Sequence, residues 1–103
     1  MHARLVSFSG GNAETRDRWV RTIQDTVIPT LRGHEGFAGY IGLVSQDTQQ
    51  VKGLVFWDSE ESAEAAEQAV RERRREVSGG VGLTEESAEL YEVLALEMEA
   101  ARV

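Results

Sequence analysis

Two segments in the middle of the chain are apolar on both faces, and this pattern limits the folds that the sequence can adopt. Residues 36–45 and 51–58 each predict a strand, because aromatic and β-branched residues gather there between turn-forming neighbours. In the first segment the residues predicted to share one face are Phe37, Ile41 and Leu43, and those of the other face are Ala38, Tyr40 and Val44. In the second segment the two opposing pairs are Val55 with Trp57 and Leu54 with Phe56. A sheet with one face in water would be polar on that face, so both faces of these strands need a cover.

The residues before these strands predict a strand and a helix. Residues 3–9 form the strand, and the helix follows with Asn12 as its N-cap and with Gly33 after its end in a positive-φ conformation. Pro29 lacks an amide hydrogen, so it should kink this helix or start a separate last turn. The short polar loop 45–50 then joins the two central strands as an antiparallel hairpin.

The second half of the chain predicts another helix and a last strand. Asp58 or Ser59 caps the helix, and Asp58 with Glu61 has the spacing of a capping box. The glycine-rich residues 78–82 end this helix in a loop, and residues 87–99 predict the final strand. A helix in this last segment is the alternative, because of the four-residue spacing of Leu90, Leu94 and Met98.

The resulting order, β-α-β-β-α-β, predicts an α+β fold of the ferredoxin-like type. Four antiparallel strands would carry both helices on one face of the sheet. The other face would then expose several large side chains, each worth about 1.5 to 3 kcal/mol when buried. A second copy of the chain, packed face to face about a two-fold axis, is the simplest cover, so we expect a homodimer.

Length, charge and cysteine content exclude several classes of protein. A chain of 103 residues predicts a single domain, residues 1–103. A formal net charge of -7 repels nucleic-acid phosphates and anionic lipids, so neither is an expected partner. The chain has no cysteine, which excludes disulfides and thiolate chemistry, and no apolar run long enough to span a membrane. We expect a cytoplasmic location.

The turns and strand ends of the chain resemble those of a known family, the antibiotic biosynthesis monooxygenase domains of the dimeric α/β barrel superfamily. The resemblance rests on Pro29 near the end of a helix, on the run from Leu31 to Tyr40, on the run from Phe56 to Ala63, and on the run from Tyr91 to Val93. It covers nearly the whole chain. It implies two ferredoxin-like protomers whose sheets join into a barrel, with ligands between each sheet and its helices.

The resemblance also implies a range of activities that need no resident cofactor. Family members oxidise polycyclic aromatic compounds with oxygen and without metal or flavin, others open haem oxidatively, and some are isomerases. The haem-degrading and anthrone-oxidising branches carry a tryptophan where Ala66 stands here, and the haem branch adds a histidine near the position of residues 73–76 and an asparagine in the first strand. Haem degradation is therefore not expected, and the anthrone mechanism does not transfer residue by residue.

Two residues are candidates for catalysis. His34, beside Glu35 after the first helix, could act as a general base with a pKa held near neutrality, or it could be a solvated loop residue. The hydroxyl of Tyr40 could orient a phenolic or quinone oxygen, or bond a backbone group. With only two histidines and no cysteine, one chain does not offer a histidine-rich metal site.

Three further residues are candidates for substrate binding. Trp57 could stack on a flat substrate or anchor the core. The hydroxyl of Tyr91, like that of Tyr40, could orient a substrate oxygen or bond a backbone group. Arg4 could point inward towards an anionic partner such as an enolate or phenolate, or outward, as an edge strand would favour. The arginine-rich residues 71–75 are interpreted as a solvated helix face that pairs with nearby glutamates.

Three functions remain open at the level of sequence. The first is a cofactor-independent monooxygenase that acts on a small aromatic or quinone-type compound. The second is a non-catalytic homodimer of the same fold that binds a small hydrophobic molecule or serves as a structural module. The third is an isomerase.

Overall fold

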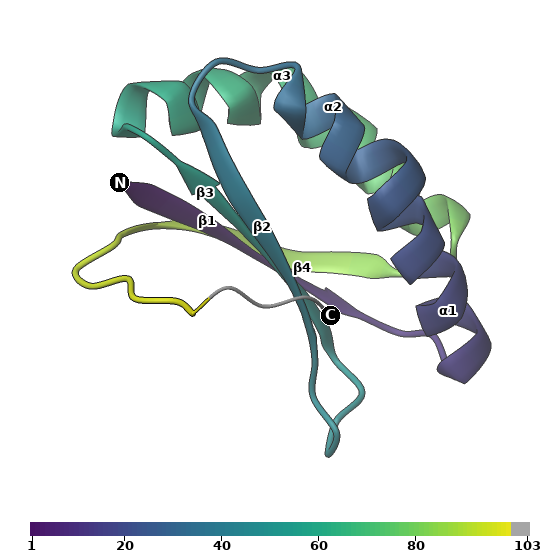
Figure 1. Ribbon diagram of the computed structural model, residues 1–103. Helices are drawn as coiled ribbons and strands as arrows, with labels where there is room; N and C mark the ends of the chain where they lie inside the picture. The colour runs from purple at the N-terminus through teal and green to yellow at the C-terminus, as the bar shows by residue number, and fades with distance from the viewer. Residues whose placement is uncertain (100–103) are drawn as a thin grey trace.

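The computed structural model describes residues 1–99 and consists of one sheet with helices on a single face (Figure 1). The elements, in chain order, are β1 His2–Ser9, α1 Ala13–Thr22, the π-helical turn η1 Ile23–Val27, α2 Ile28–Arg32, β2 Phe37–Val44, β3 Val51–Trp57, α3 Glu60–Gly80 and β4 Thr84–Glu92. The strands lie in the order β2-β3-β1-β4, and each neighbouring pair is antiparallel. The predicted ferredoxin-like α+β fold is confirmed.

The first helical stretch is continuous but changes its winding before Pro29. Asn12 caps α1 as predicted, and its side-chain oxygen accepts a hydrogen bond from the Thr15 amide at 3.0 Å. Within the stretch the Ile28 amide donates to the Ile23 carbonyl, a five-residue spacing, and α2 then begins with Pro29 in its first turn. The separate last turn that Pro29 predicted is therefore confirmed as α2, and a π-helical turn, η1, precedes it. The expectation of a positive φ at Gly33 is wrong, since its φ is -72°.

A bulge near the start of β2 changes which side chains share a face. Phe37 pairs with Trp57, whereas Gly39 already pairs with Phe56, so Ala38 is an extra residue in the ladder. Phe37 therefore lies on the helix-covered face with Tyr40. Its predicted grouping with Ile41 and Leu43 is wrong, because strict alternation does not hold across a bulge.

The ends of α3 and β4 differ from the predicted ones. Ser59 is the N-cap of α3, with its hydroxyl accepting from the Ser62 amide at 3.1 Å, in place of a capping box from Asp58. The helix continues to Gly80, through residues predicted to be a loop. The last strand begins at Thr84 and ends at Glu92, and residues 93–99 form neither strand nor helix.

The core fills the space between the sheet and the helices in two clusters. One contains Phe8 and Trp19, whose rings meet edge to face with 5.4 Å between their centroids. The other contains Trp57 with Ala63 and Ala66, the small residues of α3 that let this helix lie close to the sheet. The two clusters thereby hold the α1–α2 stretch and α3 against the same face of the sheet.

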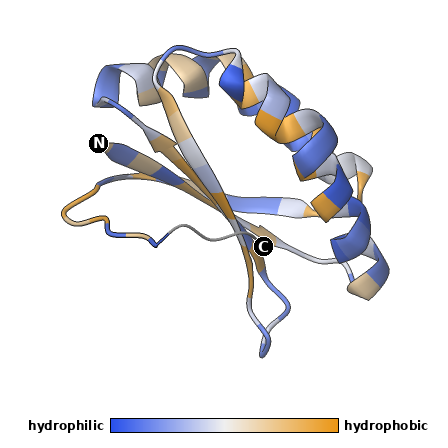
Figure 2. Ribbon diagram, in the orientation of Figure 1, coloured by the Kyte–Doolittle hydropathy of each residue, from blue (hydrophilic) through white to orange (hydrophobic). Residues whose placement is uncertain are grey.

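The opposite side of the sheet, called the outer face below, is only partly covered. Its apolar residues alternate with the core positions of the strands and include Leu5, Ile41, Leu43, Leu54 and Phe56. Phe56 is buried and Leu43 is exposed. The segment after β4 runs back along this side (Figure 1) and carries apolar residues of its own (Figure 2). In that segment Leu94 is 90% exposed.

Candidate functional site

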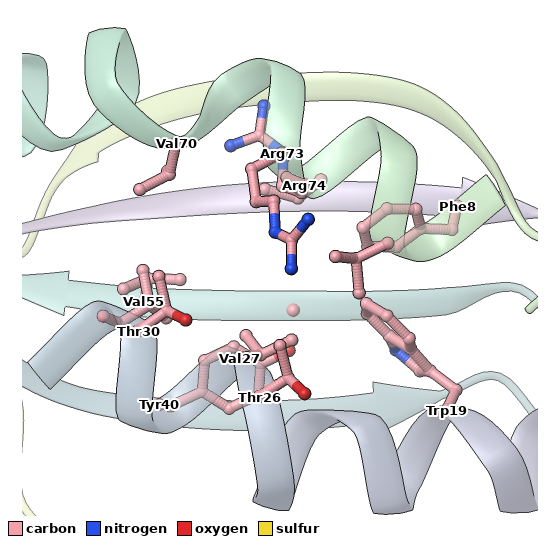
Figure 3. Close-up of a pocket in the computed structure, with 14 residues that line it drawn as sticks. Phe8, Trp19, Thr26, Val27, Thr30, Tyr40, Val55, Val70, Arg73 and Arg74 are labelled. Carbon is pink, nitrogen blue, oxygen red and sulfur yellow. The ribbon is translucent and has the colours of Figure 1, made fainter. Parts of the chain in front are cut away.

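A small cavity lies between the helix-covered face of the sheet and the helices (Figure 3). Its volume is about 70 Å³, and most of its lining is apolar. The side chains that bring polar groups to it are Trp19, Thr26, Thr30, Tyr40, Arg73 and Arg74. No histidine, aspartate or glutamate belongs to the described lining. The cavity thus offers mainly hydrogen-bond donors and hydroxyls, and no carboxylate or imidazole base.

Tyr40 enters the cavity from β2 and lies across the backbone of the neighbouring strand. A Cβ atom added to Gly53 of β3 would stand 2.6 Å from the tyrosine hydroxyl oxygen, so the phenol occupies the space that a side chain at this position would take. Burial raises the pKa of Tyr40 to about 12. The phenol therefore stays protonated at neutral pH and can donate a hydrogen bond to a ligand oxygen.

Trp19 lies at one end of the cavity, on α1, and was not among the predicted site residues. It is only 3% exposed, and its indole Nε1 has no hydrogen-bond partner within the described structure. An unpaired buried N–H costs about 1–3 kcal/mol, so a ligand acceptor that reached this nitrogen would form a favourable hydrogen bond. In the sequence, Trp19 has the four-residue spacing with Ile23 and Val27 that is typical of the buried side of a helix, and this spacing does not distinguish a cavity wall from ordinary core.

Arg74 reaches the cavity from α3 and is held by two carboxylates. Its Nη1 and Nη2 donate to Glu67 at 2.6 and 3.0 Å, and its Nε donates to Glu85 of β4 at 2.7 Å. Burial favours the neutral arginine, but the hydrogen bonds that Arg74 donates to both carboxylates, together with their negative charges, outweigh it and raise the pKa of Arg74. The interpretation of residues 71–75 as a solvated face is wrong at this position, where the side chain is 15% exposed.

Arg4 belongs to the same ion cluster. Its strand, β1, lies between β3 and β4, so the expectation of an edge strand and an outward side chain is wrong. The guanidinium is buried under α3, 3.3 Å from Glu64 and 3.7 Å from Glu67. The anionic partners of Arg4 in this structure are thus carboxylates of the chain itself.

The other predicted site residues do not line the cavity. His34 lines a separate polar depression of about 390 Å³ with Asp58 among its neighbours. Trp57 is buried in the core, and Tyr91 is exposed and donates to Glu89 at 2.5 Å. Of the five predicted site residues, Tyr40 is the one that lines the cavity.

Residues 1–99 contain neither a metal-binding cluster of side chains nor a membrane-spanning helix. No group of three or more histidine, cysteine, aspartate or glutamate side chains there is arranged to hold a metal ion. No helix within this range is both long enough and apolar enough to cross a membrane.

Solved structures of similar fold include oxygenases. A monooxygenase from the gene ActVA-Orf6 of Streptomyces coelicolor, solved in complex with the ligand nanaomycin D, superposes with a TM-score of 0.73 at 20% identity, over 96% of this chain and 92% of that one. SnoaB, a cofactor-independent oxygenase from Streptomyces nogalater, gives 0.65 at 15% identity, over 95% and 97% of the two chains. This chain has the fold of these oxygenases.

The same fold also occurs in a protein without an assigned reaction. A protein of unknown function from Nitrosomonas europaea gives a TM-score of 0.66 at 12% identity, over 97% of this chain and 95% of that one. No protein-family model matches the chain, and no curated protein matches its sequence. The fold therefore occurs both in oxygenases and in a protein of unknown function.

Proposed function

We propose that this protein is a small cofactor-independent monooxygenase that acts on an aromatic or quinone-type compound bound between the sheet and the helices. The observation that carries the proposal is the composition of the cavity, in which apolar walls surround the Tyr40 hydroxyl and the unpaired indole N–H of Trp19. Such walls suit a flat hydrophobic ring system, and the two donors suit its oxygens. The shared fold with oxygenases supports the same conclusion.

In this chemistry the substrate itself is the reductant of oxygen. An anthrone-type CH2 carbon loses two hydrogens, one oxygen atom of O2 becomes its carbonyl oxygen, and the other leaves as water. The reaction begins when the substrate gives up an acidic proton, which leaves negative charge on its oxygen. A neutral Tyr40 donates to that oxygen, where the charge develops, and the apolar walls keep competing water away. Because the described lining holds no carboxylate or imidazole, the proton passes to water at the open rim of the cavity, where Arg73 is exposed.

The cavity must enlarge to admit such a compound. Pockets for ligands of this size measure about 300–1,000 Å³, against about 70 Å³ here. The wall that contains Thr26 and Val27 belongs to the π-helical turn η1, and π-helical turns are frequent at functional sites. We propose that this stretch moves away from the sheet when a substrate enters.

Oxygen uptake tests the oxygenase directly. A panel of anthrones and dihydroquinones should give enzyme-dependent oxygen consumption, and Tyr40→Phe should lower it by about 10²-fold, the usual loss of one oxyanion donor. Tyr91→Phe is the matched control, because this tyrosine is exposed and lies outside the cavity. No uptake above a heat-inactivated sample with any compound would remove the oxygenase proposal.

The second candidate is a non-catalytic dimer that binds a small hydrophobic molecule. The absence of a carboxylate or imidazole from the described lining favours it, since binding needs no proton acceptor. It predicts tight binding of aromatic compounds without oxygen uptake, so the same panel separates the two candidates.

Both candidates include pairing of two chains through the outer face. The exposed Leu43 in the sheet and the exposed Leu94 and Leu96 after β4 support this pairing, because they leave apolar surface in water. Sedimentation equilibrium at micromolar concentration should give twice the 11.4 kDa chain mass. A mass of one chain would contradict the dimer.

A further inference from the structure

Arg73 and Arg74 are neighbours in α3 and both line the cavity, but they differ in their partners. Arg74 is engaged by Glu67 and Glu85 through short hydrogen bonds. Arg73 is 66% exposed, and within residues 1–99 its single ion pair is with Glu76 one turn later, with 3.8 Å between Nη1 and Oε2. That distance is too long for a hydrogen bond. The guanidinium of Arg73 is therefore an almost uncommitted cation at the rim of the cavity.

The surroundings of Arg73 make its charge available to a ligand. No acidic residue belongs to the described lining, so nothing inside the cavity cancels this charge. In Figure 3, Arg73 and Arg74 extend from α3 on the side of the cavity opposite Thr26 and Val27. A ligand whose ring system lies between these walls would place its edge beside a free guanidinium. A planar guanidinium binds a carboxylate with two parallel hydrogen bonds, which is a strong and directional pairing.

We infer that Arg73 makes this cavity selective for aromatic compounds that carry a carboxylate at the edge nearest α3. The inference rests on the proposed ligand-binding role of the cavity and adds the class of ligand to it. The aromatic part of the ligand lies against the apolar walls, with its oxygens near Tyr40 and Trp19. The carboxylate stays at the rim, where Arg73 pairs with it and water still reaches its second side.

The test compares two ligands of the same shape and different charge. Isothermal titration calorimetry on the full chain would measure anthraquinone-2-carboxylate and the neutral anthraquinone-2-carboxamide. The carboxylate should bind about fivefold to tenfold more tightly, the range expected of one charge-assisted pairing at a partly exposed site. In Arg73→Gln this preference should vanish, while the affinity for the carboxamide stays within about twofold.

Arg71→Gln is the matched control. It removes the same charge from the same helix, and its exposed side chain does not line the cavity. It should keep the preference for the carboxylate. Circular dichroism would verify that both variants fold, as expected for exposed positions.

The outcomes separate this inference from the proposal on which it rests. If both ligands bind with equal affinity, or if Arg73→Gln keeps the preference, the role of Arg73 is refuted and the cavity remains a ligand site. If Arg71→Gln loses the preference equally, the selectivity comes from the general charge of the helix and the inference is also refuted. If the wild-type chain binds neither ligand, the proposed use of the cavity fails with it.

Discussion

Glu67 of α3 is the carboxylate that connects Arg4 of β1 with Arg74 of the same helix, and its replacement by glutamine tests the strength of this buried charge pairing. Its side chain is 14% exposed, accepts two hydrogen bonds from Arg74 and lies 3.7 Å from the Nε of Arg4. Glu67→Gln keeps the shape and one acceptor but removes the charge. Arg4 would then keep only Glu64, and Arg74 only Glu85.

The size of the effect follows from what stays paired. Removing one partner of a fully buried ion pair costs about 3–5 kcal/mol. Here both arginines keep a second carboxylate and the amide oxygen keeps one hydrogen bond, so we expect a loss of about 2–3 kcal/mol in the free energy of unfolding. Glu64→Gln is the control, because Glu64 is 54% exposed and an exposed pair contributes about 0–1 kcal/mol.

The effect should depend on pH in a defined direction. Burial opposes ionisation of Glu67, but the hydrogen bonds and charge of Arg74, with the charge of Arg4, hold its pKa below the ordinary value of 4.5. A carboxyl whose pKa is lowered by folding stabilises the protein above its unfolded pKa, and this contribution is lost as the pH falls through the folded pKa. The difference between wild type and Glu67→Gln should therefore be full at pH 7 and shrink below about pH 4.5.

Urea unfolding followed by tryptophan fluorescence, at one fixed protein concentration, measures this difference. The reasoning would be refuted if Glu67→Gln lay within about 0.5 kcal/mol of wild type at pH 7, the range of ordinary surface substitutions. An equal loss in Glu64→Gln would also refute it, because the effect would then not depend on burial.

Two further predictions concern Tyr40. Gly53→Ala should destabilise the chain by about 1–3 kcal/mol, since the added Cβ would stand 2.6 Å from the phenol oxygen. The loss should be smaller when Tyr40→Phe is combined with it. Urea titration of the two single variants and the double variant measures these differences in the free energy of unfolding. Because burial raises the pKa of Tyr40 from 10.0 to about 12, its stabilising contribution is complete below pH 10 and is lost towards pH 12. Across that interval wild type should lose about 2–3 kcal/mol more stability than Tyr40→Phe, and equal losses in the two proteins would contradict the buried phenol.

The order of the elements could be predicted from the sequence because it depends on local signals. Asn12 caps a helix through an amide three residues away, and Pro29 disrupts the backbone hydrogen bonds of its own turn. Runs of aromatic and β-branched residues between turn-forming neighbours identified the central strands. The bulge at Ala38 was missed because it depends on how β2 pairs with β3. The residues of β2 alone do not indicate this pairing.

The site depends on contacts between distant segments, and these could not be predicted. Arg4 was expected at an edge because nothing near it in sequence shows that β1 is central or that Glu64 would meet it 60 residues later. Trp19 had the spacing of any core residue. Only the folded chain shows that its indole nitrogen lacks a partner and that it lines the same cavity as Tyr40.

The chain offers an internal comparison for the claim that the cavity is a ligand site, because one tryptophan lines it and the other does not. Trp19 forms one end of the cavity, whereas Trp57 is buried in the other core cluster. A 1H–15N correlation spectrum resolves the two indole N–H signals, which single replacements by phenylalanine would assign. On titration with anthraquinone-2-carboxylate, the Trp19 signal should shift in proportion to the bound fraction while the Trp57 signal stays in place. Saturable binding that shifts the Trp57 signal and leaves the Trp19 signal unmoved would contradict the account.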